Sequence, residues 1–214
     1  MPNIKLLPEP QGEVERVYFL LKAWILNGVM RPGDFLSEVE LARKCETSRT
    51  PVREACNLLS QEKWIQRIRH KGYVLPPISV RDIIEVYEYR KILECFNAER
   101  TVARATAEEV RELREMVVLE DGPALEMDAF LRGNQGFHMR LGEIAGNQRV
   151  IEQLQWTLQY VHRLDVLSTQ RDTRPVPHRE IVRAIEARNV QEAGRAMADH
   201  INVSRDQMLR LFGT

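Results

Sequence analysis

Three histidines and an asparagine in the C-terminal half of the chain have the spacing of a metal site. Asn134 and His138 are four residues apart in a helical run, so their side chains share one face of a helix. His178 and His200 each lie 11 residues from Asn189, where a turn between the last two helices is predicted. If those helices form an antiparallel hairpin, the two imidazoles meet across it. One amide oxygen and three imidazoles would then hold a metal ion inside a helical bundle. The alternative is that the histidines serve packing or lie at the surface.

A second group of side chains is basic and lies in the first third of the sequence. Between residues 43 and 71 there are eight Lys and Arg against three Asp and Glu, although the whole chain has 31 of each and a net charge of zero. Phosphate groups respond to a local basic face more than to the global charge. Nucleic acid is therefore a candidate partner.

The sequence predicts three helices in the segment that contains these basic residues. Apolar residues recur at three- and four-residue spacing over 14–25, and Gly28 ends that helix. Ser37-x-x-Glu40 has the form of a capping box and begins a short helix over 38–44. A tight turn then leads into a second helix that begins near Ser48 and carries a proline in its first turn, where proline is tolerated.

Two short helices joined by a tight turn place the start of the second helix in a DNA major groove. Residues 65–68 and 72–75 flank a basic turn and are predicted to form a two-stranded wing. The alternative, a helical hairpin with solvated arginines, does not explain the basic wing. The predicted DNA-binding residues are Arg43, Ser48, Arg49, Thr50, Arg53, Arg69, His70, Lys71 and Gly72.

The remainder of the chain is predicted to be almost wholly helical. Pro76 and Pro77 indicate an extended connector, so a linker is expected at 76–79, between a DNA-binding domain at 1–75 and a helical domain at 80–214. The predicted fold class is all-α dominated, with an N-terminal winged helix-turn-helix and a C-terminal antiparallel bundle of about six helices. Its helices are expected at 79–105, from Thr106, at 125–144, at 148–168 and on both sides of Asn189, with a polar loop at 171–177.

Composition excludes several other classes of protein. The apolar run from Tyr18 to Met30 is too short and too polar to span a membrane, so no membrane partner is expected. The three cysteines are odd in number and lack CxxC spacing, which favours reduced thiols and a cytoplasmic location.

The N-terminal motif resembles a known family. The run LSEVELARKCETSRTPVREA at 36–55, with Arg-Pro-Gly at 31–33 before it and the wing glycine after it, is similar to the helix-turn-helix of the GntR family of bacterial transcription regulators. Many members of that family carry an arginine at the position of Val39. The resemblance therefore implies that Arg49, Arg53 and the wing supply more of the DNA recognition in this chain.

The C-terminal motifs resemble the FCD effector domain of the FadR branch of that family, in its short six-helix VanR-like form. The matching motifs are Asn134-x-x-Phe-His138, Ala145-Gly-Asn147, His178-x-x-Ile-x-x-Ala-Ile185, Met197-x-x-His200 and Arg90-x-x-x-Glu94. The resemblance implies that Asn134, His138, His178 and His200 bind a divalent metal, with zinc favoured over nickel or manganese. An asparagine as the first ligand makes the site less negative.

The hypothesis for function is a homodimer that binds a palindromic operator and responds to a small carboxylate. Four protein ligands on an octahedral ion leave two positions for the carboxylate, and Arg90 and His162 are the expected additional effector contacts. One alternative keeps the DNA-binding regulator but has the histidines bind the acid without a metal. A distant alternative is a metal-dependent hydrolase, for which Glu180 is the nearest general base. The sequence does not identify the effector, the operator or the sign of regulation.

Overall fold

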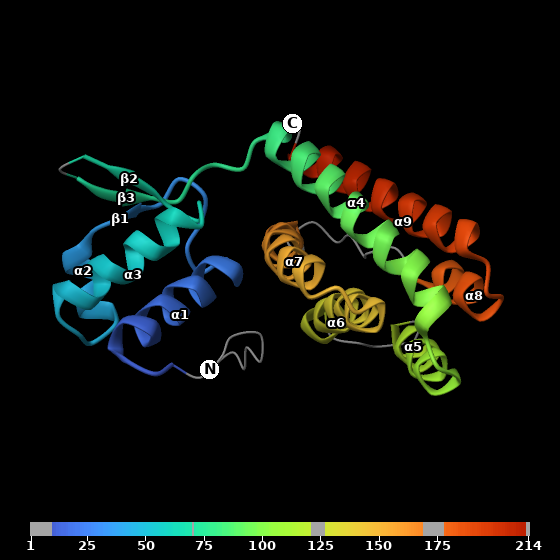
Figure 1. Ribbon diagram of the computed structural model, residues 1–214. Helices are drawn as coiled ribbons and strands as arrows, with labels where there is room; N and C mark the ends of the chain where they lie inside the picture. The colour runs from blue at the N-terminus through green and yellow to red at the C-terminus, as the bar shows by residue number, and fades with distance from the viewer. Residues whose placement is uncertain (1–9, 70, 121–126, 169–177, 213–214) are drawn as a thin grey trace. The chain divides into compact units, whose positions relative to one another are not determined.

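The computed structural model describes residues 10–69, 71–120, 127–168 and 178–212. The chain divides into two compact units, Met1–Ile78 and Ser79–Thr214 (Figure 1). In the described ranges no helix combines the length and the apolar composition needed to cross a membrane.

The first unit packs three helices against a small antiparallel sheet. Its elements are α1 (Glu13–Leu26), β1 (Phe35–Leu36), α2 (Glu38–Lys44), α3 (Arg49–Gln61), β2 (Gln66–Ile68) and β3 (Gly72–Val74), with strand order β1-β3-β2. The core is formed by the apolar faces of α1 and α3 together with Trp64, which precedes the wing. Val17 of α1 and Leu59 of α3 are fully buried in it. This is the predicted winged helix-turn-helix.

Two local details of this unit differ from the sequence-based expectation. Strand β1 was not predicted; it is two residues long and pairs Phe35 with Val74 of β3, a contact without a local sequence signal. Ser37 has the extended backbone of an N-cap, with φ −87° and ψ 129°, but its side chain makes no capping hydrogen bond. The predicted capping box with Glu40 is therefore wrong, and the extended conformation of Ser37 continues the strand that ends at Leu36.

Gly72 is required by the turn of the wing. Its φ of 112° lies in the left-handed region, and a Cβ atom there would be 2.5 Å from the Leu36 carbonyl oxygen. A residue with a side chain would therefore strain the turn and push β1 away from β3.

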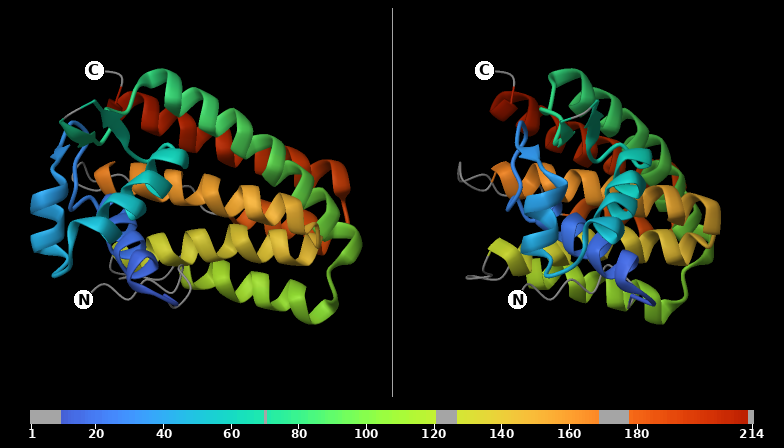
Figure 2. Two further views of the ribbon diagram at one scale, coloured as in Figure 1. Left: turned by 60° about the vertical axis from the view of Figure 1, so that its left-hand side comes forward. Right: turned by 90° about the vertical axis from the view of Figure 1, so that its left-hand side faces the viewer.

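The second unit is helical throughout its described residues. It consists of α4 (Val80–Arg104), α5 (Ala107–Glu120), α6 (Met127–Ala145), α7 (Gln148–Ser168), α8 (Arg179–Glu186) and α9 (Val190–Phe212). Helix α4 packs most extensively along α9 and also contacts α6, α7 and α8. Both views in Figure 2 show α4 and α9 side by side along one side of the bundle. The predicted fold class is thereby confirmed, while the expected loop at 171–177 lies outside the described residues.

Capping hydrogen bonds explain where these helices begin. The Ser79 side chain accepts from the Asp82 backbone and the Asp82 carboxylate accepts from the Ser79 backbone, which fixes the start of α4. Thr106 and Glu109 exchange the same pair of bonds at the start of α5. Asn189 caps α9 through its side-chain oxygen, which accepts from the backbone N–H of Glu192 at 3.1 Å.

Candidate metal centre and DNA-binding surface

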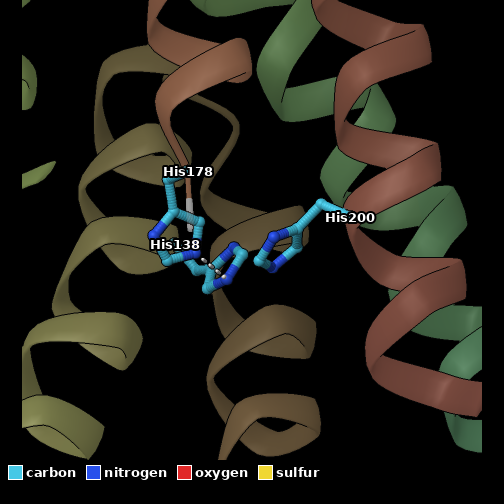
Figure 3. Close-up of side chains that lie close together, drawn as sticks. All are labelled: His138, His178 and His200. Carbon is cyan, nitrogen blue, oxygen red and sulfur yellow. Dashed lines mark hydrogen bonds between the residues drawn. The ribbon is translucent and has the colours of Figure 1, made fainter. Parts of the chain in front are cut away.

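The three histidines singled out in the sequence come together in the core of the helical unit. His138 lies on α6, His178 is the residue before α8, and His200 lies on α9. One ring nitrogen from each histidine lies within 4.8 Å of those of the other two, and the three residues are 0 to 5% exposed (Figure 3). We call these three residues the histidine cluster. The Nε2 atoms of His138 and His178 are 3.1 Å apart.

Packing holds the rings of the cluster in place. Phe137 stacks on His178 with ring centroids 4.2 Å apart and an interplanar angle of 24°. The centroids of His178 and His200 are 4.5 Å apart. The equal spacing of these two histidines from Asn189 therefore does bring them together, as the hairpin argument required.

Glu94 of α4 sets the orientation of the His138 ring. Its Oε2 atom contacts Nδ1 of His138, and Oε1 accepts from Nε of Arg90 at 2.5 Å. A carboxylate on Nδ1 fixes the proton there and turns the lone pair of Nε2 towards the rest of the cluster. Sequence reasoning noted Glu94 only as part of a motif in the first helix of this unit, and missed this role.

Arg90 lies directly beside the cluster. It is 2% exposed, and its Nη2 atom is 2.8 Å from Nε2 of His138. Burial acts to raise the pKa of Glu94, but Arg90 and His138 outweigh burial and lower the pKa to about 2. The Arg90–Glu94 pair is therefore ionised and internally neutral.

His138 is neutral in this environment. Burial lowers its pKa to about 4; the Glu94 carboxylate opposes this change and Arg90 adds to it. A neutral imidazole is the form that binds a metal ion, and in this structure the Nε2 lone pair of His138 accepts a hydrogen bond from Nη2 of Arg90 at 2.8 Å.

The residues present fit a divalent cation. Asn134 lies one helical turn before His138 on α6 and is 7% exposed, and its Oδ1 atom has no hydrogen-bond partner in the described part of the chain. A buried carbonyl oxygen left without a donor is costly, and a cation would satisfy it. Three imidazoles and one amide oxygen suit zinc, nickel or manganese.

Two other predicted residues, His162 and Glu180, are not members of the histidine cluster. His162 is half-buried on α7. Glu180, the general base of the hydrolase alternative, is 68% exposed and pairs with Arg183 at 2.7 Å. That carboxylate therefore lies in an exposed ion pair on α8.

The predicted DNA-binding side chains lie on the surface of the first unit. Those on α2, on α3 and beside the wing are exposed, and Gly72 is half-buried; His70 lies outside the described residues. The exposed residues are Arg43, Ser48, Arg49, Thr50, Arg53, Arg69 and Lys71. Val39 is 59% exposed beside them.

An acidic residue that the sequence reasoning missed organises this surface. Glu38, at the start of α2, accepts from Nη2 of Arg53 at 3.0 Å and lies 3.7 Å from Nη2 of Arg49. The hydrogen bond from Arg53 is the main cause of the lowered pKa of Glu38. The carboxylate thus pairs with two exposed arginines of α3.

A winged helix-turn-helix joined to a helical bundle with a buried histidine cluster is typical of a class of two-domain DNA-binding regulators. Residues 13–75 match the family described as bacterial regulatory proteins, gntR family, and residues 85–203 match the FCD domain. The chain therefore belongs to the GntR family of transcription regulators, in the group that carries an FCD effector domain.

Individual relatives agree with this assignment. The chain is 26% identical over 205 residues to the uncharacterized HTH-type transcriptional regulator YdhC of Bacillus subtilis, covering 92% of this chain and 91% of YdhC. It is 27% identical to the Nta operon transcriptional regulator of Aminobacter aminovorans, covering 85% and 88% of the two chains. The solved structure of Escherichia coli McbR/YncC shares the fold, with a TM-score of 0.74 and 17% identity over 95% of this chain and 100% of that one.

Proposed function

We propose that this regulator binds a divalent metal through Asn134, His138, His178 and His200, and that a small carboxylate at this site changes its affinity for operator DNA. The carrying observation is the buried histidine cluster, in which one ring nitrogen from each of the three residues lies within 4.8 Å of the other two. Zinc is the favoured ion, with nickel and manganese as alternatives, and the protein is expected to act in the cytoplasm.

The charge balance of the site favours an anionic effector. None of the four proposed ligands is a carboxylate, and Glu94 is already balanced by Arg90 at 2.5 Å. A divalent ion held there would supply a positive, Lewis-acidic centre for a carboxylate. Arg90 orients the anion from α4, and His162 is the proposed second contact from α7.

A homodimer is proposed because palindromic half-sites require two winged domains. Val80, Ile84 and Ile92 lie on one face of α4 at multiples of four residues and are 42, 36 and 68% exposed. This stripe is the proposed contact between two copies. Sedimentation analysis of the protein at micromolar concentration tests this proposal, and a monomer would contradict it.

Elemental analysis of protein purified without chelator tests the metal site. Wild type is expected to hold close to one equivalent of metal per chain, and a His138→Ala, His200→Ala double variant is expected to hold none. His162→Ala is the control, since it removes a histidine of the same unit that is not a proposed ligand. Absence of metal from wild type after reconstitution would overturn the coordination proposal.

One observation favours a second candidate, a regulator whose pocket binds the acid without metal. Arg90 already approaches Nε2 of His138 at 2.8 Å, which is the atom proposed as a metal ligand. In this alternative the guanidinium and the imidazoles hold the carboxylate by hydrogen bonds. Binding of lactate to chelator-treated protein with the affinity of the metal-loaded protein would favour this candidate.

A further inference from the structure

An ion pair joins the two helices of the helix-turn-helix on the predicted DNA-binding surface. Glu38 is the first residue of α2, and its carboxylate accepts hydrogen bonds from Arg53 of α3. The Nε atom of Arg53 lies 3.2 Å from both carboxylate oxygens, and its Nη2 atom lies 3.0 Å from Oε2. Arg49 approaches the same carboxylate less closely, with Nη2 at 3.7 Å from Oε2. Glu38 therefore constrains Arg53 more tightly than Arg49.

The contacts with Glu38 occupy one edge of the Arg53 guanidinium. A guanidinium carries five N–H donors in one plane, and Nε together with Nη2 forms its side edge. Since Glu38 takes that edge, the remaining donors are those of Nη1 and the outer N–H of Nη2. The Arg53 side chain is 52% exposed and that of Glu38 only 17%. The free end of the guanidinium is therefore the part of this pair that DNA can reach.

The charge of the pair disfavours a phosphate group at this free end. The hydrogen bond from Arg53 is the largest cause of the lowered pKa of Glu38, so the carboxylate is ionised at neutral pH. The pair then has no net charge, and a phosphate that approaches Arg53 also approaches the Glu38 carboxylate. Directional hydrogen bonds to an uncharged base are left as the main source of affinity.

The donors at the free end match one base in the major groove. Guanine presents two neighbouring acceptors there, N7 and O6, and an arginine binds both with two N–H groups in one plane. Adenine has the same N7 acceptor but an amino group at the second position, which would face an arginine N–H. The hydrogen-bonding pattern therefore favours guanine.

We propose that Arg53 reads a guanine through the free end of its guanidinium, and that Glu38 is the positioning residue that makes this reading selective. This inference rests on the proposed function, because it assigns roles within the surface that is proposed to bind the operator. A guanidinium fixed by Glu38 has lost its rotational freedom before DNA binds, and it cannot turn to meet acceptors elsewhere. Glu38 thus weakens binding to DNA in general and disfavours sites without a guanine at this position.

Two duplexes test the positioning role of Glu38 on the full chain by fluorescence anisotropy. One is the duplex that wild type enriches most strongly from a random library, and the other is a scrambled duplex of the same composition. Glu38→Gln is expected to raise the affinity for the scrambled duplex about 3- to 10-fold without raising that for the enriched duplex, so the ratio of the two affinities falls by about that factor. Glu40→Gln is the matched control, because Glu40 is exposed on the same helix and carries the same charge. It is expected to keep the wild-type ratio.

Substitution of guanine by 7-deazaguanine tests the contact of Arg53. The analogue replaces N7 with C–H and leaves the base pairing and the phosphates unchanged. Introduced at one guanine at a time in the enriched duplex, it is expected to weaken wild-type binding about tenfold at one position of each half-site. Arg53→Lys keeps the charge but lacks the planar pair of donors, so it is expected to lose no more than about threefold at that position. Arg49→Lys is expected to retain the full loss there.

The outcomes separate this inference from the function on which it rests, with circular dichroism to verify that each variant is folded. An unchanged ratio in Glu38→Gln, or an equal fall in Glu40→Gln, would overturn the role of Glu38. Insensitivity of wild type to 7-deazaguanine, or full sensitivity of Arg53→Lys at the same position, would overturn the guanine contact. If wild type enriches no duplex, the proposed operator binding itself fails, and the inference is rejected with it.

Discussion

Replacing Glu94 with glutamine tests how the bundle prepares His138 for a metal ion. Glutamine keeps the size of the side chain but removes its charge. In the native site one carboxylate serves both Arg90, at 2.5 Å, and Nδ1 of His138. Outer-shell partners of this kind change metal affinity by about 10- to 100-fold, so zinc affinity is expected to fall within that range.

The same substitution leaves the buried Arg90 without its counter-charge. Breaking a buried ion pair by removing one partner costs about 3–5 kcal/mol, so the apo form of Glu94→Gln is expected to unfold more readily. An Arg90→Met, Glu94→Gln double variant removes both charges and is expected to recover much of this stability. If the fall in zinc affinity arises from the lost acceptor for Nδ1–H of His138, the double variant keeps the low zinc affinity of Glu94→Gln.

Competition with a chromophoric chelator at neutral pH measures zinc affinity directly, and far-UV circular dichroism verifies that the helices are retained. Glu88→Gln is the matched control, because Glu88 lies on the same helix but is exposed. A folded Glu94→Gln variant that binds zinc within about threefold of wild type would refute the reasoning that this carboxylate orients His138.

Three further predictions concern the DNA-binding surface and the buried acid. Val39→Arg adds a cation at a position that is 59% exposed. It is expected to tighten binding to a random-sequence duplex and to steepen the salt dependence of that affinity by about one charge. An unchanged slope of affinity against salt concentration, measured by fluorescence anisotropy, would contradict this. Glu38→Gln releases Arg49 and Arg53 from their carboxylate and removes a negative charge from the predicted DNA-binding surface. The affinity for a random-sequence duplex is therefore expected to rise about 3- to 10-fold at low salt. No rise in the same assay would count against the role of Glu38. The pKa of Asp165 is raised from 3.8 to about 7, so its contribution to the free energy of unfolding is present below pH 4 and is lost as pH rises through 7, by up to about 4 kcal/mol. Asp165→Asn is expected to flatten this pH dependence, measured by denaturant unfolding at pH 5 and pH 8. Parallel pH profiles of wild type and variant would refute this prediction.

Local signals in the sequence predicted the helices well. The helices expected to begin near residues 79 and 106 do so, each at a capping box, Ser79–Asp82 and Thr106–Glu109, and α7 begins and ends at the predicted residues. These signals succeed because a cap joins residues three positions apart, and local chemistry is enough to fix it. The box at Ser37 fails because that residue also continues a strand paired with a distant segment.

The histidine cluster was predictable in part. The symmetric spacing of His178 and His200 about a turn places two rings together, and His138 followed from its helical pairing with Asn134. The contact of Glu94 with His138 and the charge interaction of Asp165 with Arg90 join different helices, and the spacing of these residues in the sequence does not predict either of them. Such contacts depend on the rotation of each helix about its axis, which the sequence pattern defines only coarsely.

The continuity of α4 has a mechanical consequence. The helix runs from Val80 to Arg104 without glycine or proline, so it lacks the usual sites of bending. At 1.5 Å rise per residue, Arg90 lies about 15 Å along the axis from Val80, and a 4° tilt about Arg90 would displace Val80 by about 1 Å. The helix would therefore move as a rigid rod. A small tilt at the buried arginine would displace the segment that precedes Ser79, because α4 does not bend between the two.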